Sequence, residues 1–362
     1  MEHIVRARIL VLHLFEFAEE VDLGKLRALW ADSTIGELVG RGHQPDAIRF
    51  RDPPVVLPLG HRPLTNEHAG TVRAKVHDFG IVSLVWTLPF SGTWAELVEE
   101  SARLQADLSI ESVARQLLGE ITPRLEAAAK GPIGRSKLVE DYFITYVEAF
   151  DTPVRADDLL ARKGDELARV LRGERGEMSR DERSDALRLH HSYRSDDLVI
   201  VTWNSAFVLD PEQSTDHLDI IEFANAQLLD LRYYDEMLEA ELGAVYDGFS
   251  GTAGGSRRRR LARTSKKLMQ LMIEIYDVQD KVRNAIKITG DVYLARIYRM
   301  TGESLRLGRW EEMVDAKLRI VQQVAQLLLE EMNQKRSVLL ELMVIFLILI
   351  EVIMAFVGPG HR

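Results

Sequence analysis

Strand-like and helix-like patterns of apolar residues alternate along the first part of the chain. Residues 4–15 are rich in β-branched and apolar side chains and predict a strand, which a helix follows. A proline- and glycine-rich stretch at 36–70 predicts loop with short edge strands, and residues 71–88 predict a pair of strands. Thr93, with Glu96 three residues later, is typical of a capping box at the start of the next helix.

The same order of elements then returns. It comprises a strand at 141–150, a helix at 156–171, a strand pair at 197–203 and 206–209, and a long helix at 214–246. The segment at 78–83 also resembles the one at 197–202. We therefore predict a duplicated β-α-β-β-α unit, with pseudo-repeats at about 1–130 and 138–247, that makes one α+β globular body over 1–247.

A glycine-rich linker at 248–256 separates this body from a helical region at 257–337. Apolar residues there recur at spacings of three and four, as in coiled coils. The first run is Leu268, Leu271, Ile275, Val278, Val282 and Ala285, and the second is Val314, Leu318, Val321, Ala325, Leu328 and Met332. Glycines at 290, 302 and 308 interrupt the pattern, so we predict a long helical coiled-coil hairpin.

The chain continues into a strongly apolar segment at 338–357, followed by a short tail at 358–362. Twenty helical residues span about 30 Å, the thickness of a bilayer core. Eighteen of the twenty are apolar, and the exceptions are Glu341 and Glu351. This pattern predicts one C-terminal transmembrane helix, and Lys335 with Arg336 before it place the body on the cytoplasmic side of an inner membrane. The alternative is a buried helix of a soluble oligomer.

Glu341 and Glu351 can be interpreted in two ways. They are ten residues apart and fall on one side of a helix. One interpretation places them near the headgroups or keeps them protonated. The other makes them contacts between neighbouring protomers, and so an assembly element inside the membrane.

Composition narrows the classes of function. The chain has no cysteine, which excludes disulfides and thiolate sites, and its net charge of −10 argues against a general nucleic-acid coat. Its first residues lack the pattern of a secretory signal. One basic run stands out: Arg257, Arg258, Arg259 and Arg260. Folding the predicted hairpin places this run near Lys335 and Arg336, where it would contact anionic lipid; RNA or a ribosome, or solvent alone, are the alternatives.

No motif for catalysis or cofactor binding appears, so we expect no cofactor and no small-molecule substrate, and a protein that is not an enzyme. The strongest candidates for chemistry are His190, His191 and Asp197, because His and Asp can ligate a metal or share acid–base work. Their spacing matches no known site, and charged residues before a strand usually belong to a loop.

Two segments carry a family resemblance. The C-terminal run resembles the end of the required-for-meiotic-nuclear-division family, with a Leu-Glu at 340–341, an aliphatic run, and an Ile-Glu-Val at 350–352. Residues 78–82 also resemble that family's Asp-Phe-Gly-Val-Val strand. The family's shared region is a domain of unknown function. The resemblance implies an inner-membrane protein that forms homo-oligomers and supports translation of organelle-encoded proteins, without catalytic activity.

These observations favour a non-enzymatic, membrane-anchored, oligomeric scaffold or tether, which would link translation or assembly machinery to the membrane. Its expected partners are the lipid bilayer, further copies of the chain, and a ribosome or other protein. One alternative is a membrane-tethered metal-dependent hydrolase that uses His190, His191 and Asp197. Another is a sensor of anionic lipid that reads the surface through its four consecutive arginines.

Overall fold

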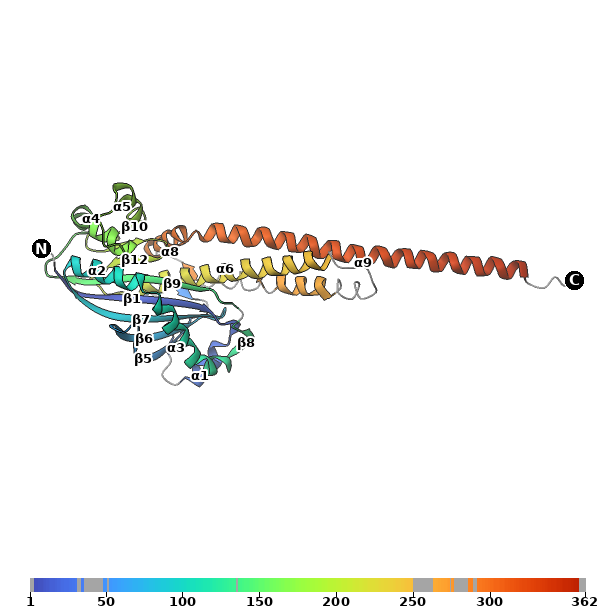
Figure 1. Ribbon diagram of the computed structural model, residues 1–362, viewed down its shortest axis with the longest axis horizontal. Helices are drawn as coiled ribbons and strands as arrows, with labels where there is room; N and C mark the ends of the chain where they lie inside the picture. Colours follow the sequence, from blue (N-terminus) through green and yellow to red (C-terminus); the bar gives the residue numbers. More distant parts are fainter. Residues whose placement is uncertain are drawn as a thin grey trace. The chain divides into compact units, whose positions relative to one another are not determined.

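The computed structural model describes residues 3–30, 34–35, 48–50, 52–134, 136–249, 263–273, 275–276, 286–288 and 292–357 (Figure 1). They form two compact units. We call the first, Met1–Tyr233 with Val278–Glu311, the α+β unit, and the second, Tyr234–Asp277 with Glu312–Arg362, the helical unit. A large sheet combined with helices confirms the predicted α+β class.

The α+β unit is built on a nine-stranded sheet in the order β10-β11-β12-β9-β1-β7-β6-β5-β3. Its centre is β1 (Ile4–Glu16), which runs antiparallel to β7 (Ile81–Gly92) on one side and to β9 (Val139–Phe150) on the other. The remaining strands of this sheet are β3 (Thr34–Ile35), β5 (Val55–Pro63), β6 (Ala69–Val76), β10 (His190–His191), β11 (Leu198–Val201) and β12 (Ser205–Leu209). The pairing of β12 with β9 is parallel, and every other pairing in this sheet is antiparallel.

Two short ribbons complete the strands: β2 (Ala18–Val21) pairs with β8 (Ala129–Ile133), and β4 (Ile48–Phe50) pairs with β13 (Ile286–Ile288). The helices are α1 (Leu23–Leu29), α2 (Trp94–Ala106), α3 (Ser109–Glu126), α4 (Ala156–Arg172), α5 (Arg180–Ala186), α6 (Asp216–Phe249), α8 (Val292–Ser304) and α9 (Leu307–Val357). The capping box is confirmed: the Thr93 side chain accepts from the Glu96 amide, and the Glu96 carboxylate accepts from the Thr93 amide at 2.7 Å. The strand β5, with its two prolines, is longer than the loop prediction at 36–70 allowed.

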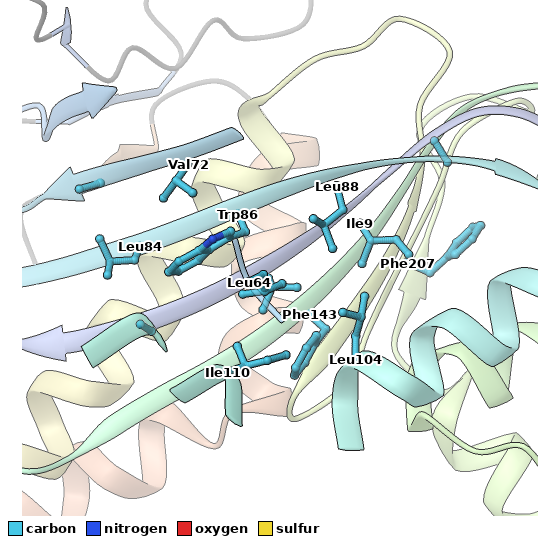
Figure 2. Close-up of a cluster of buried hydrophobic side chains, with 14 of the residues drawn as sticks. Ile9, Leu64, Val72, Leu84, Trp86, Leu88, Leu104, Ile110, Phe143 and Phe207 are labelled. Carbon is cyan, nitrogen blue, oxygen red and sulfur yellow. The ribbon is translucent and has the colours of Figure 1, made fainter. Parts of the chain in front are cut away.

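Alternation along the strands gives the sheet two apolar faces. On one face, Trp86 is fully buried, its indole N–H donates to the Pro63 carbonyl at 3.3 Å, and helices α2, α3 and α4 contribute to the same core. Figure 2 shows the side chains of Leu64 and Leu84 in this cluster beside Trp86. On the opposite face, Lys75 of β6 reaches Asp219 of α6, so α6 covers the sheet from the other side. A sheet buried on both faces explains the nearly continuous apolar sequence of β1.

The prediction of a membrane-spanning helix at 338–357, and with it a single-pass location in an inner membrane, is wrong. Within the part of the chain that the structure describes, none of the helices has a run both long enough and apolar enough to cross a bilayer. A crossing needs about 20 residues, whereas the side chains described in this segment are those of 343–348 and Ile350. These side chains lie on α9 and are 36–63% exposed.

A tight approach of the backbone at Gly80 positions the start of β7. Gly80 has φ +85°, and its carbonyl accepts from the amide of Phe17 at 3.0 Å. A Cβ at this position would lie 1.7 Å from the Ala18 carbonyl oxygen. Only glycine combines this dihedral with this contact.

We expect Gly80→Ala to lower the free energy of unfolding by about 3 kcal/mol or more, because backbone strain adds to a clash with main-chain atoms. Gly119→Ala is the matched control, since Gly119 lies inside α3 with nothing within 4 Å of an added Cβ. Alanine there should raise the stability by about 0.5–1 kcal/mol. Urea unfolding measures both, and equal stabilities of the two variants would contradict the prediction.

Candidate functional site

The histidines predicted to carry chemistry are separated by the geometry of their strand. His190 and His191 are adjacent on β10, so their side chains point to opposite sides. Nδ1 of His190 lies 2.7 Å from the Leu187 carbonyl, and Nε2 of His191 lies 3.2 Å from the Arg296 guanidinium. Partial burial and the Arg296 charge lower the pKa of His191. A cation so close to His191 opposes the binding of a metal ion on that nitrogen.

Asp197, the third predicted residue, closes a turn. Its buried Oδ1 accepts from the amides of Tyr193 at 2.7 Å and Arg194 at 3.2 Å. This is the hydrogen bonding that an Asp commonly supplies in a loop before a strand. Among the described residues, no three side chains of the His, Cys, Asp or Glu type are arranged to hold a metal ion.

The other predicted contact residues fall where the structure says nothing of their side chains. Arg257, Arg258, Arg259 and Arg260 lie outside the described residues, as do 250–256 of the predicted linker. The helix α9 includes Lys335, Arg336, Glu341 and Glu351, but the structure does not describe their side chains. Their proposed roles stay predictions.

Sequence reasoning missed a pocket of about 560 Å³ in the α+β unit. It lies among β9, the ends of α4 and α5, the β11–β12 turn, α6, and the junction of α8 with α9. Its lining includes four arginines, three carboxylates and two tryptophans: Arg172, Arg188, Arg232, Arg306, Glu140, Asp185, Glu303, Trp203 and Trp310. No sequence signal joins residues so far apart in the chain, and each arginine alone is typical of a solvated surface.

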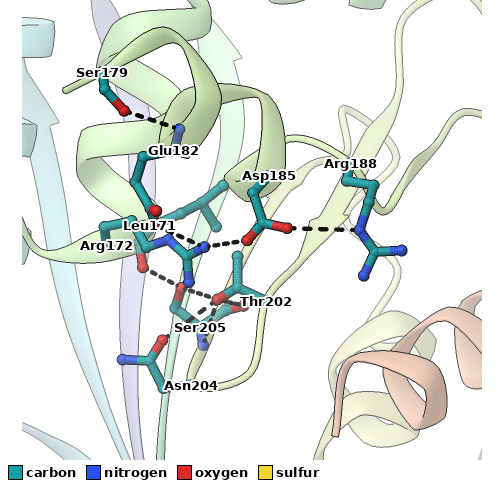
Figure 3. Close-up of polar contacts among 9 residues, drawn as sticks. All are labelled: Leu171, Arg172, Ser179, Glu182, Asp185, Arg188, Thr202, Asn204 and Ser205. Atoms are coloured by element: carbon teal, nitrogen blue, oxygen red, sulfur yellow. Dashed lines mark hydrogen bonds and ion pairs between the residues drawn. The ribbon is translucent and has the colours of Figure 1, made fainter. Parts of the chain in front are cut away.

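Ion pairs organise this arginine pocket. Arg172 contacts Asp185 at 2.6 Å and Glu182 at 2.9 Å, as Figure 3 shows. Arg188 reaches Glu303 at 2.8 Å, and Arg232 contacts Glu140. The guanidinium of Arg172 is the most enclosed of the three, with 15% of its side chain exposed. Its Nε is buried without an acceptor among the described residues.

The turn that carries Trp203 is fixed by hydrogen bonds to β9 and α4. The hydroxyl of Tyr142 donates to the carbonyls of Thr202 at 3.0 Å and Ser205 at 2.7 Å. The Ser205 hydroxyl donates to the Leu171 carbonyl of α4 at 2.5 Å. Trp203 itself is 64% exposed. A fixed turn therefore presents a large aromatic ring to solvent at the rim of the arginine pocket.

The helical unit carries a second candidate surface, made of apolar side chains. On α9, Met313, Ile320 and Leu327 are 37–63% exposed and follow one another at intervals of seven residues. On the helical residues 263–273 and 275–276, exposed Met269, Ile273 and Tyr276 follow at intervals of four and three. We call these two sets the exposed stripes. The intervals of four and three are those of a coiled-coil seam, and the interval of seven on α9 repeats one position of the heptad.

A buried ion cluster joins α6 to the sheet. Nζ of Lys75 lies 2.6 Å from Asp219 and 2.7 Å from Glu222. Burial alone would lower the pKa of Lys75, but the two carboxylates raise it above its ordinary value. Burial likewise favours the neutral form of Glu222, but Lys75 and Arg73 outweigh it and hold that pKa down. The cluster is an enclosed structural contact rather than an open site.

His77 lies beside this cluster, with 3% of its surface exposed. Its ring centroid is 5.0 Å from that of Phe79 and 6.0 Å from that of Phe223. Its Nε2 has no hydrogen-bond partner in the described part of the chain. Burial in this apolar setting lowers the pKa of His77 to about 3, although Glu222 raises it in part.

This lowered pKa predicts sensitivity to acid. Below pH 6.5 the unfolded chain binds a proton at His77 that the folded chain refuses, so stability falls as the pH drops from 6.5 toward 3. Between pH 7 and pH 4.5 the wild type should lose about 2–3 kcal/mol more than His77→Leu. Unfolding by urea at both pH values measures the difference. His61→Leu, at an exposed histidine, is the control and should keep the wild-type slope.

The comparisons with known proteins concern mainly the α+β unit. The chain is 25% identical over 220 residues to uncharacterized protein MJ0711 of Methanocaldococcus jannaschii, a stretch that covers 60% of this chain and 66% of that protein. No solved structure matches the chain. The family model described as uncharacterized protein MJ0711, N-terminal domain, matches residues 6–216. Because this match covers more than half of the 362 residues, the chain belongs to the MJ0711 N-terminal domain family.

Proposed function

We propose that the protein is a non-enzymatic assembly protein, whose helical unit joins copies of the chain into an oligomeric scaffold. The observation that carries this proposal is the pair of exposed stripes, on α9 and on residues 263–276. Each repeats apolar side chains at heptad-related spacing on a helix face where these side chains are 37–69% exposed. The α+β unit would then be presented in several copies.

Contacts inside the helical unit support the helical hairpin that the sequence predicted. Both helices have a buried apolar face. On the first helix it includes Leu268 and Ile275, and on α9 it consists of Val314, Leu318, Val321 and Ala325. The Ser265 hydroxyl donates to the Ala325 carbonyl at 3.4 Å. Lys317 of α9 pairs with Asp235 of α6 at 2.7 Å. The helix at 263–276 and α9 thus each pack through one apolar face, as the two helices of a hairpin do.

The exposed stripes are second faces on the same helices. At 100° per residue, the exposed stripe of α9 lies roughly 130° around the helix from the buried one. The stripe on residues 263–276 is separated from its buried face by about the same angle. A helix needs only one apolar face to pack against its own chain. A second face at heptad spacing therefore indicates a further helical partner.

A second copy of the chain is the partner that fits these features. A seam at heptad spacing accepts a helix with the same spacing, and both exposed stripes of one chain offer such a helix to the other. Closed symmetric pairing of identical surfaces is also the commonest form of soluble oligomer. Exposed apolar side chains also occur further along α9, at 343–348.

Other predicted roles stay hypotheses. The resemblance to the required-for-meiotic-nuclear-division family, with its ribosome or assembly partner, has no support in the family match, which concerns the MJ0711 N-terminal domain. The positions of His190, His191 and Asp197 give no support to a metal-dependent hydrolase. The lipid-sensor hypothesis depends on the four consecutive arginines, which lie outside the described residues.

The self-association can be tested with charges in the seam. In the double variant Ile320→Glu, Leu327→Glu, two carboxylates would be buried at each copy's interface, at a cost of about 2 kcal/mol or more each. We expect the dissociation constant of the oligomer to rise at least about 100-fold. Sedimentation velocity of the full chain in a mild detergent, from 1 to 50 µM, measures this.

The matched control is Gln322→Glu, Gln326→Glu, which adds the same charge to exposed positions of α9 away from the stripe. It should keep the wild-type mass. A wild-type chain that is monomeric at 50 µM would overturn the proposal, and so would a seam variant that keeps the wild-type mass.

A further inference from the structure

The arginine pocket is concave, enclosed by several elements, and unrelated to the stripes of the helical unit. All its lining residues belong to the α+β unit. Its volume of about 560 Å³ falls within the usual range for pockets that enclose a small ligand, about 300–1,000 Å³. The question is which ligand its chemistry would recognise.

Charge favours an anion. The lining holds four arginines against three carboxylates, on a chain whose net charge is −10. Each carboxylate already contacts an arginine: Asp185 meets Arg172, Glu303 meets Arg188, and Glu140 meets Arg232. Arg306 pairs with no carboxylate among the described residues. Glu182, just outside the lining, also contacts Arg172, so Arg306 is the guanidinium of the pocket that no carboxylate of the described chain contacts.

Arg172 offers further capacity for an anion. The side chains of its partners Glu182 and Asp185 are more than half exposed, so water already weakens these ion pairs. Its Nε is buried, so the terminal nitrogen that makes both of these ion pairs is the donor to which an anion would bind. A guanidinium donates through a planar fork, which matches the oxygens of a phosphate. Phosphate oxygens can compete with these exposed carboxylates for the guanidinium of Arg172.

The backbone at Arg306 supports a functional reason for that arginine. Arg306 has φ +56°, one of two non-glycine residues with positive φ in the described chain. This left-handed conformation costs about 1 kcal/mol or more for a residue with a side chain, and glycine would adopt it without strain. The position sits at the α8–α9 junction. An arginine at a site suited to glycine indicates that its guanidinium is needed there.

The two tryptophans add an aromatic requirement. Trp203 is 64% exposed on its rigid turn, and Trp310 in the first turns of α9 is half-buried. An exposed indole is a good stacking surface for a flat ring, because every nucleobase presents a π-face. Arginines that suit phosphate and an indole that suits a base lie on the same pocket.

We propose that the arginine pocket binds a nucleotide, with the phosphates held by Arg172 and Arg306 and the base stacked on Trp203. This site is independent of the self-association proposed above, because no residue of the exposed stripes lines it.

Isothermal titration calorimetry of the full chain tests this with ATP, adenosine and inorganic phosphate as separate probes. ATP should bind at least 10-fold more tightly than either adenosine or inorganic phosphate. Trp203→Ala should weaken ATP binding about 10-fold or more, since stacking contributes to affinity, and leave inorganic phosphate unaffected. Equal affinities for ATP and inorganic phosphate would overturn the role given to the base.

Arg306→Gly separates function from folding. Glycine relieves the strained dihedral, so this variant should melt at the wild-type temperature or above it while ATP binding weakens at least 10-fold. Arg309→Ala, at an exposed arginine one turn along α9 that does not line the pocket, is the control and should bind ATP as the wild type does. Absence of ATP binding by the wild type at 1 mM, or wild-type affinity in Arg306→Gly, would overturn the proposal.

Discussion

The pairing of β1 with two long neighbours is the constraint on which the α+β unit depends. Eleven residues of β1 have a partner in β7, and eleven have a partner in β9, although β9 begins more than 120 residues after β1 ends. The first pairing holds the β5-β6-β7 meander, and the second holds the β9–β12 half that carries the arginine pocket. Because both faces of β1 are covered, a change in its register by one residue would turn apolar side chains into the wrong layer on both faces. The position of Glu140 at the pocket, opposite Leu14 of β1, is fixed by this register.

Charge is used in two different ways in this unit. At Lys75 the ions are enclosed between β6 and α6, and each carboxylate compensates a cation that would otherwise be costly to bury. Removing one member leaves the others without compensation, so the cluster specifies how α6 lies on the sheet. In the arginine pocket the carboxylates of Asp185 and Glu303 are more than half exposed. Water can replace such partners at small cost, and an anion can compete for their arginines. Burial, rather than the residue types, separates a structural ion cluster from a site open to ligands.

The sequence predicted what local physics determines. Three predictions depended only on residues close together in the chain: the strand at 4–15, the capping box at Thr93 and the long helix from about residue 214. The structure has β1, the cap and α6 at these places. Strand order was not predictable, because it depends on pairings between distant segments. The predicted pseudo-repeats would give β7 and β12 equivalent places, yet β7 runs antiparallel to β1 whereas β12 runs parallel to β9. The hydropathy of 338–357 led to a transmembrane prediction that the described helices do not support. The arginine pocket was missed because its lining runs from Glu140 to Trp310.

The boundary of the family match divides the arginine pocket. Residues 6–216 contain Glu140, Arg172, Asp185, Arg188 and Trp203, whereas Arg232, Glu303, Arg306 and Trp310 follow the match. The matched part alone thus supplies the stacking ring and two arginines that are already paired. The unpaired guanidinium and the strained backbone that presents it come from the segment beyond. If affinity for an anion rests on that unpaired charge, it is a property of the whole chain and not of the matched domain. A chain that has only residues 6–216 in common with this one would lack the unpaired guanidinium of Arg306. In this chain the α8–α9 junction, rather than the matched domain, is therefore the segment on which the proposed anion binding depends.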